Sequence, residues 1–68
     1  MSQDYYFLMR RSGLFFQLCT HGRWLKTASI YEASAFSEEG AQFVLTHYIP
    51  EDDQSSWHIL HITADIAD

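Results

Sequence analysis

Two aromatic-rich runs near the amino end constrain the fold of this chain most strongly. The sequences YYFLMR (residues 5–10) and LFFQLC (residues 14–19) each have the length of a β-strand. Ser12-Gly13, a dipeptide typical of turns, lies between them. The pattern therefore predicts an antiparallel β-hairpin.

The register of this hairpin decides which side chains share a face. A two-residue turn at Ser12-Gly13 would pair Met9 with Phe16 and would gather the apolar side chains on one face. A slip of one residue would mix apolar and polar side chains on both faces. The first face would be almost wholly apolar and would hold Tyr5, Phe7, Met9, Leu14, Phe16 and Leu18. The second face would be mixed and would hold Tyr6, Leu8, Arg10, Phe15, Gln17 and Cys19.

A third strand follows a second tight turn at His21-Gly22. The sequence RWLKT (residues 23–27) would pair Leu18 with Leu25 and Cys19 with Trp24. Leu25 would then join the apolar face, while Trp24 and Lys26 would join the mixed face. We expect a helix to cover the apolar face.

That helix has the clearest start signal in the chain. Ser37 is a favourable N-cap, and Glu38 and Glu39 follow it where the helix dipole favours negative charge. Pro50 marks the end, because the residue before a proline resists helical geometry. An apolar stripe at helical spacing joins these limits, namely Ala41, Val44, Leu45 and Tyr48.

The remaining segments complete a small α+β domain. Residues 50–56 (PEDDQSS) are predicted to be an exposed loop, and residues 57–63 (WHILHIT) a fourth strand. Residues 28–36 suit either a loop with a short helical turn or a full helix. We expect one domain over residues 1–68, ordered β-β-β-α-β. It would have a three- to four-stranded, mainly antiparallel sheet, with one helix on one face and the last strand beside either the first or the third.

Charge is distributed unevenly along the chain. The net charge is −5, and all four Lys and Arg residues precede Thr27. Residues 1–26 therefore carry +4 − 1 = +3, and the remainder carries −8. Such asymmetry bears on partners rather than on fold. It predicts a protein partner with a basic surface and argues against binding of nucleic acid.

No motif for catalysis or for a cofactor is present. The chain lacks a phosphate-binding loop, a dinucleotide fingerprint and a calcium loop. Its single cysteine, Cys19, has His21 as a candidate base, but no oxyanion-hole motif or orienting acid is evident. His58 and His61 are three apart on a predicted strand, so they should point to opposite faces and share no metal. We expect one of them at the core or a subunit interface and the other in water. We expect no enzyme, no cofactor and no metal site.

Two surfaces are candidates for binding. The first lies on the helix, where Phe43 should point away from the core with His47 beside it; the partner-binding residues would be Phe43, His47, Glu38, Glu39, Glu51, Asp52 and Asp53. The second is the mixed sheet face, if it stays open. It could stack single-stranded nucleic acid through Tyr6, Arg10, Phe15, Trp24 and Lys26. A further alternative is a homodimeric structural or accessory protein that buries this mixed face between its subunits.

The chain shows no sign of export or membrane insertion. Its start lacks the pattern of a signal peptide, and no apolar run approaches the roughly 20 residues of a membrane span, so we expect a cytoplasmic protein without membrane contact. In size, acidity and lack of catalytic motifs it resembles small phage or prophage products of the anti-CRISPR type. The stretch FSEEGAQFV (residues 36–44) is a common helix opening, and no residue role is transferred. The resemblance implies an inhibitor that blocks a nuclease complex in the cytoplasm of a host cell.

Overall fold

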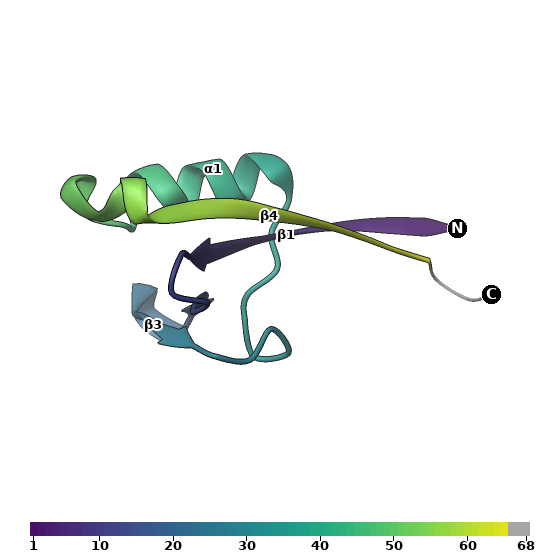
Figure 1. Cartoon of the computed structure of the whole chain (residues 1–68), viewed down its shortest axis with the longest axis horizontal. Helices are drawn as coiled ribbons and strands as arrows, with labels where there is room; N and C mark the ends of the chain where they lie inside the picture. Colours follow the sequence, from purple (N-terminus) through teal and green to yellow (C-terminus); the bar gives the residue numbers. More distant parts are fainter. Residues whose placement is uncertain (66–68) are drawn as a thin grey trace.

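Four antiparallel strands form one sheet, and a single α-helix packs on one of its faces (Figure 1). The computed structural model describes residues 1–65. The elements are β1 (Ser2–Arg10), β2 (Phe15–Leu18), β3 (Trp24–Thr27), α1 (Glu38–His47) and β4 (Trp57–Asp65). Short 3-10 helices, η1 (Thr20–Gly22) and η2 (Glu51–Ser56), precede β3 and β4. The predicted α+β class and element order are confirmed, and η2 replaces the predicted loop.

The sheet order is β3-β2-β1-β4, which places the last strand beside the first. β4 pairs with β1 over its full length, from Ser2 opposite Asp65 to Arg10 opposite Trp57. We call this pair of strands the β1–β4 ribbon. It continues beyond the start of α1, so one end of the ribbon projects from the rest of the molecule (Figure 1).

The predicted register of the first hairpin is wrong by one residue. Met9 lies opposite Phe15 rather than Phe16. The backbone N–H of Arg10 donates to the carbonyl of Leu14 at 2.7 Å, so the connection has three residues, Arg11 to Gly13, instead of two. Gly13 has φ +92°, the left-handed conformation that commonly ends such a three-residue loop.

The second hairpin is shifted in the same way. Leu18 lies opposite Trp24, not Leu25, and Gln17 lies opposite Leu25. The loop again contains one residue more than the two-residue turn allows, because Thr20 joins His21 and Gly22 in η1. His21 and Gly22 both have positive φ, at 61° and 74°.

These shifts exchange the two faces of β1. The helix covers the face that carries Leu8, which was predicted to be mixed, and not the face that carries Phe7 and Met9. Phe16 does lie under the helix, as predicted. The apolar residues expected on one face are therefore divided between both faces of the sheet.

The core lies between α1 and this covered face. Leu8 and Phe16 are fully buried and pack with Val44, Ile49 and Trp57. The Phe16 ring is surrounded by aromatic rings whose centroids lie 5.0–6.3 Å away, those of Trp24, Phe36, Tyr48 and Trp57. At these distances tilted and edge-on pairs add to the burial energy.

The helix begins as predicted. The N–H of Gly40 donates to the Ser37 hydroxyl oxygen at 3.0 Å, which confirms the N-cap. Ala41 and Val44 of the predicted stripe are buried, and Leu45 and Tyr48 pack at the core's edge. The helix therefore buries the predicted stripe.

Residues 28–36 form turns rather than a full helix. They run on the side of the sheet opposite α1 (Figure 1). At their end, Phe36 and Tyr6 exchange two backbone hydrogen bonds of 2.8 and 3.1 Å, and the N–H of Ser34 donates to the carbonyl of Phe16. The segment thus fills the gap that opens where β2 diverges from β1.

Candidate partner-binding surfaces

The outer face of α1 carries an exposed aromatic pair. Phe43 is 54% exposed, and the His47 ring stacks on it with 4.0 Å between centroids and 14° between planes. The His47 Nδ1 atom lies 3.0 Å from the Phe43 carbonyl oxygen, so with the proton on Nδ1 the ring donates a hydrogen bond to the helix backbone. Both residues point outward, as the helical spacing predicts, and the pair is held in one orientation before any partner arrives.

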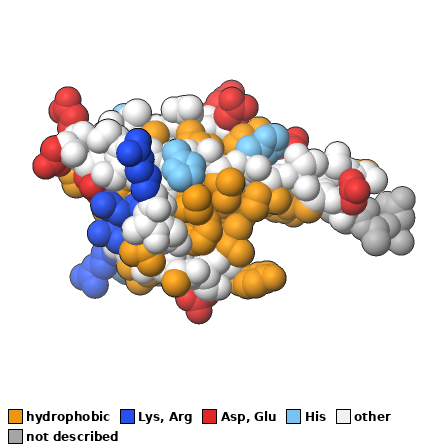
Figure 2. Space-filling view, in the orientation of Figure 1, with side chains coloured by type: hydrophobic (Ala, Val, Ile, Leu, Met, Phe, Trp, Pro, Cys, Tyr) orange, Lys and Arg blue, Asp and Glu red, His pale blue; other side chains and the backbone are white. Residues whose placement is uncertain are grey.

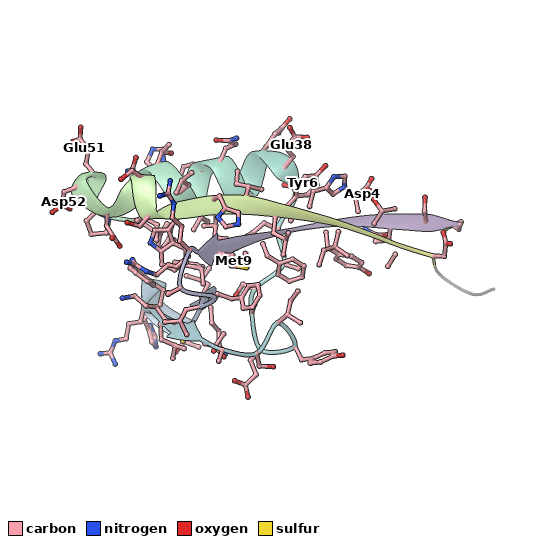
Figure 3. All side chains as sticks on the ribbon, in the orientation of Figure 1. Asp4, Tyr6, Met9, Glu38, Glu51 and Asp52 are labelled. Atoms are coloured by element: carbon pink, nitrogen blue, oxygen red, sulfur yellow. The ribbon has the colours of Figure 1, made fainter. Side chains whose placement is uncertain are left out.

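Acidic side chains stand at both ends of this pair. Glu38 and Glu39 are exposed in the first turn of α1, where they line a shallow depression with Ser37 and Gln42. Glu51 and Asp52 are exposed in η2, beyond the other end of the helix (Figure 3). A ten-residue helix spans about 15 Å, and Glu51 and Asp52 lie beyond its end, so the two acidic groups lie on either side of the aromatic pair along the helix.

Asp53, predicted to bind a partner, is used inside the fold. Its carboxylate accepts hydrogen bonds from Nε1 of Trp57 at 3.1 Å and from Nη1 of Arg10 at 2.6 Å. The Trp57 hydrogen bond, followed by that of Arg10, holds the pKa of Asp53 below its ordinary value of 3.8. Because these contacts join β1, η2 and β4, Asp53 stabilises the fold, and its carboxylate is not free to contact a partner.

The predicted nucleic-acid face of Tyr6, Arg10, Phe15, Trp24 and Lys26 does not form. Trp24 packs against the core under α1, and the Arg10 guanidinium lies over the Trp57 ring and pairs with Asp53. Phe15 pairs with Met9 on the opposite side of the sheet. The one-residue shift in each hairpin is the cause, since side chains alternate along a strand.

His58 and His61 occupy opposite faces of β4, as predicted. His58 lies opposite Met9, and His61 lies opposite Tyr6. Both are exposed in the single chain, so neither takes the predicted place in the core. Residues 1–65 contain no group of three or more His, Cys, Asp or Glu side chains placed to hold a metal ion.

A polar cluster that the sequence did not predict surrounds His61. Its Nε2 atom lies 2.9 Å from Oδ1 of Asp4, and Thr63 donates to the same oxygen at 2.8 Å. These hydrogen bonds, His61 first, lower the pKa of Asp4. The His61 ring also stacks on Tyr6 with 4.4 Å between centroids. Asp4 and His61 lie at opposite ends of the sequence, so only knowledge of the β1–β4 pairing would have brought them together.

Tyr6 connects this cluster to the start of the helix. Its hydroxyl lies 3.5 Å from Oε2 of Glu38, at the outer limit of a hydrogen bond (Figure 3). Desolvation, followed by the charges of Glu38 and Asp4, raises the pKa of Tyr6. The phenol therefore stays neutral and can donate to an acceptor through the physiological pH range.

The sheet face opposite α1 is apolar and carries no Lys, Arg, Asp or Glu from the ribbon. Tyr5 lies opposite Ile62, and Phe7 lies opposite Leu60. Hydrophobic side chains gather below β4 in Figure 2, between the ribbon and the loop of residues 28–36. We call the surface formed by Tyr5, Phe7, Met9, Leu60 and Ile62 the open face. Phe7 is buried, and the other four side chains are half-buried.

Comparison of the chain with protein-family models, with curated proteins and with solved structures finds no match. Among the described residues, no helix has both the length and the apolar character that crossing a membrane requires. The candidate surfaces must therefore be judged from their own geometry.

Proposed function

We propose that this chain is a small acidic protein-binding module, an inhibitor or regulator that blocks a basic, nucleic-acid-binding surface of a partner protein. The observation that carries this proposal is the stacked Phe43–His47 pair, exposed on α1 between two groups of acids. No Lys or Arg occurs from Thr27 to the end of the chain, so the helix and η2 offer negative charge alone.

Charge and aromatic contact would have separate tasks in such a complex. Glu38, Glu39, Glu51 and Asp52 would attract a basic surface, raise the association rate and set the orientation. Phe43 would supply the desolvated contact at the centre, where aromatic residues contribute most to binding energy. His47 would hold the Phe43 ring in place and enlarge the contact area.

A nuclease complex of a host defence system is the partner class that fits both arguments. Proteins that bind nucleic acid do so through Lys and Arg contacts to phosphates, and an acidic protein competes with the phosphates for those Lys and Arg side chains. The small size, the acidity and the lack of catalytic motifs give the chain its resemblance to inhibitors of the anti-CRISPR type. On this proposal the chain acts in the cytoplasm of the host cell and is not an enzyme.

The test is capture of a partner from the source cell, followed by competition. The wild-type chain is immobilised, captured proteins are identified by mass spectrometry, and each purified partner is titrated with a labelled nucleic acid and with the chain. We expect the chain and the nucleic acid to exclude one another. We also expect affinity for the partner to fall steeply between low and high salt.

Two matched variants separate local from overall charge. Glu51→Gln with Asp52→Asn removes two acids beside α1, and Glu32→Gln with Asp65→Asn removes two exposed acids elsewhere. The first pair should weaken binding more than the second, and Phe43→Ala should weaken it at every salt concentration. Equal effects of the two pairs, a salt-independent affinity or simultaneous binding of nucleic acid would refute the proposal.

A further inference from the structure

The two edges of the sheet differ in how well they resist pairing with another chain. β3 forms one edge with four residues that include Lys26, and both short length and lysine protect an edge strand. β4 forms the other edge with nine residues, Trp57–Asp65, that include no Lys, Arg or Pro. These residues face those of β1 one to one, so no bulge interrupts this stretch. In Figure 1, β4 crosses in front of β1 with no other described element before it, so a further strand can reach it.

The hydrogen bonds of β1 show which backbone groups of β4 face outward. Tyr6 directs its N–H and its carbonyl away from β4, because it exchanges both with Phe36. Successive residues of a strand direct these groups to opposite sides, so the two neighbours of Tyr6 direct theirs to β4. Leu60 and Ile62 lie opposite those neighbours, so they point back to β1. The residues of β4 between and beside them point outward, namely Ile59, His61 and Thr63.

These outward-directed groups form a row along the edge. Among residues 1–65, neither the N–H nor the carbonyl of Ile59, His61 or Thr63 has a hydrogen-bond partner. The groups recur at every second residue, about 7 Å apart, which is the repeat of any extended strand laid beside them. An edge of this kind is a template for another strand, and several classes of domain bind extended peptides in this way.

We propose that an extended segment of a partner protein, in which Lys or Arg alternates with apolar residues, adds to the sheet as a strand antiparallel to β4. Backbone hydrogen bonds to the edge would supply affinity, and the alternate side chains of the segment would supply specificity. The antiparallel direction is chosen because antiparallel pairing is the more stable per residue.

The two sides of β4 require different side chains of that segment. On the side opposite α1, Leu60 and Ile62 are half-buried, and an apolar neighbour would complete their burial. On the α1 side, His61 and Thr63 are exposed and hydrogen-bond Asp4. Because side chains of an added strand alternate between the same two sides, the segment should alternate between apolar and polar residues.

Charge on the α1 side favours Lys and Arg as the polar residues. The carboxylate of Asp4 contacts His61 and Thr63, both of the edge strand, at 2.9 and 2.8 Å. Figure 3 shows Asp4 and Glu38 on the same side of the ribbon. The sequences of β1 and β4 contain one Lys or Arg, namely Arg10, which lies at the other end of the ribbon. A basic side chain opposite Thr63 would therefore meet negative charge alone.

Charge also favours a different protein over a second copy of this chain. Each copy carries a net charge of −5, so two copies repel one another, whereas a basic segment is attracted. The edge of β4 is separate from the exposed Phe43–His47 pair on the outer face of α1. The inference therefore does not rest on the proposed function, and either proposal can fail without the other.

Amide hydrogen exchange of the full chain with a synthetic peptide tests the added strand. The probe is a blocked nonapeptide of alternating lysine and valine, and its control has the same composition in two blocks. At about ten times its dissociation constant, the alternating peptide should slow exchange at Ile59, His61 and Thr63 by about tenfold. The amides of Leu60 and Ile62, which already bond β1, should change little, and the block peptide should have no such effect.

Two outcomes of this measurement would overturn the proposal. The first is unchanged exchange at the three outward amides in the presence of the alternating peptide. The second is exchange at these amides that slows with protein concentration in the absence of peptide, because the strand on β4 would then come from a second copy.

A matched pair of variants tests the hydrogen bonds at the edge. Thr63→Pro removes one outward N–H and keeps the hydrogen bonds between β1 and β4, and proline is tolerated where the N–H of an edge strand faces solvent. Thr63→Val keeps that N–H and removes the hydroxyl that bonds Asp4. Thr63→Pro should bind the alternating peptide about fivefold or more weakly than Thr63→Val. Circular dichroism establishes that each variant is folded, and equal affinities of the folded variants would contradict the proposal.

N-methylated peptides decide the case if Thr63→Pro fails to fold. Residues that lie opposite one another in an antiparallel pair and point outward on β4 exchange both hydrogen bonds with the added strand. The lysines would lie opposite Ile59, His61 and Thr63, so their N–H groups would face β4. Methylation of the lysine amides should weaken binding to the wild type about tenfold or more, and methylation of the valine amides should be tolerated. The reverse order, or equal effects, would overturn the arrangement.

The charge preference has its own control. Asp4→Asn should weaken binding of the lysine–valine peptide about two- to fivefold, because an exposed ion pair contributes modestly. Glu32→Gln, which removes an exposed acid away from the ribbon, should leave this affinity unchanged. A glutamate–valine peptide of the same length should not bind, and its binding with equal affinity would refute the proposed partner chemistry.

Discussion

The two ends of the β1–β4 ribbon use one arrangement of side chains in different surroundings. At the end near η2, which we call the braced end, Asp53 binds Arg10, and Arg10 lies over the Trp57 ring. At the projecting end, the free end, Asp4 binds His61, and His61 stacks on Tyr6. Each end thus has a carboxylate that holds a nitrogen-bearing side chain against an aromatic ring.

The two ends differ in how deeply these side chains are buried. The side chains of Arg10 and Asp53 are 23% and 32% exposed, whereas those of His61 and Asp4 are 48% and 58% exposed. The braced end also rests on the aromatic core, while the free end consists mainly of two paired strands. An isolated two-stranded ribbon is marginal in water, and exposed ion pairs contribute little. Similar contacts should therefore stabilise the fold at one end and only orient side chains at the other.

The largest difference should come from removing an aromatic ring that supports each end: Phe16 of β2, which packs against Trp57 of the braced end, and Tyr6 of the free end. Phe16→Ala should lower the free energy of unfolding by about 3–5 kcal/mol, because it opens a cavity among four aromatic side chains. Tyr6→Ala should lower it by clearly less. Urea unfolding followed by tryptophan fluorescence measures both. Equal losses would show that the two ends are equally braced.

Hydrogen exchange should reveal the same contrast without mutation. Amides paired near Leu8 and Ile59 should exchange about a hundredfold more slowly than those near Gln3 and Ala64, since local opening is easiest where few contacts must break. Exchange is measured by NMR. Uniform protection along the ribbon would contradict the comparison.

Gly13 tests the loop that closes the braced end. Gly13→Ala should destabilise the chain by about 1–2 kcal/mol, because φ is +92° and an L-residue is strained there. No atom lies within 4 Å of the added methyl group, so crowding does not contribute. Thermal unfolding of Gly13→Ala beside the neighbouring Ser12→Ala measures the backbone effect alone. A neutral Gly13→Ala would argue for a different loop and register.

The smallest effects should come from the two carboxylates and should depend on pH. The pKa of Asp53 and that of Asp4 are both lowered, so each ionised carboxylate stabilises the fold above its ordinary pKa of 3.8. That contribution disappears as pH falls from this value through the lowered pKa. Asp53→Asn should therefore reduce the melting temperature at pH 6 and have less effect at pH 3. Asp4→Asn should show the same trend with a smaller change, and the reverse order would count against the braced end.

Local signals in the sequence were sufficient to predict the elements of this fold. The Ser37 cap and the apolar stripe of α1 depend on residues within a few positions of one another, and both are confirmed. The strands likewise follow from short runs of aromatic and branched residues. The pairing of the strands could not be predicted in this way, because the sequence left open whether the last strand joins the first or the third.

The register was missed for a specific physical reason. Ser12-Gly13 and His21-Gly22 fit a two-residue turn, but the same glycines also serve a loop of three residues. Both faces of β1 carry large apolar side chains, with Leu8 on one and Phe7 and Met9 on the other, so the hydrophobic pattern favoured the wrong register. One extra loop residue then moved Leu8 into the core and Met9 to the open face.

The candidate site was predictable only where it depends on the helix. Helical spacing alone places Phe43 and His47 outside the core, and both are exposed. Which acids remain free is a long-range property, since Asp53 meets Arg10 from the far side of the chain. The open face was equally hidden, because it follows from the register and from the position of β4.

The pairing of the first strand with the last also affects how the chain folds while it is being synthesised. β2 can pair early with β3 and with the end of β1 through short loops, but most of β1 must wait until β4 has been synthesised. Contacts between distant parts of a chain form slowly, since a long loop must first close. During that interval the aromatic sequence of β1 lacks its longest partner and can associate with other nascent chains. The yield of folded protein should therefore depend on how soon β4 leaves the ribosome after β1, a quantity that equilibrium stability does not report.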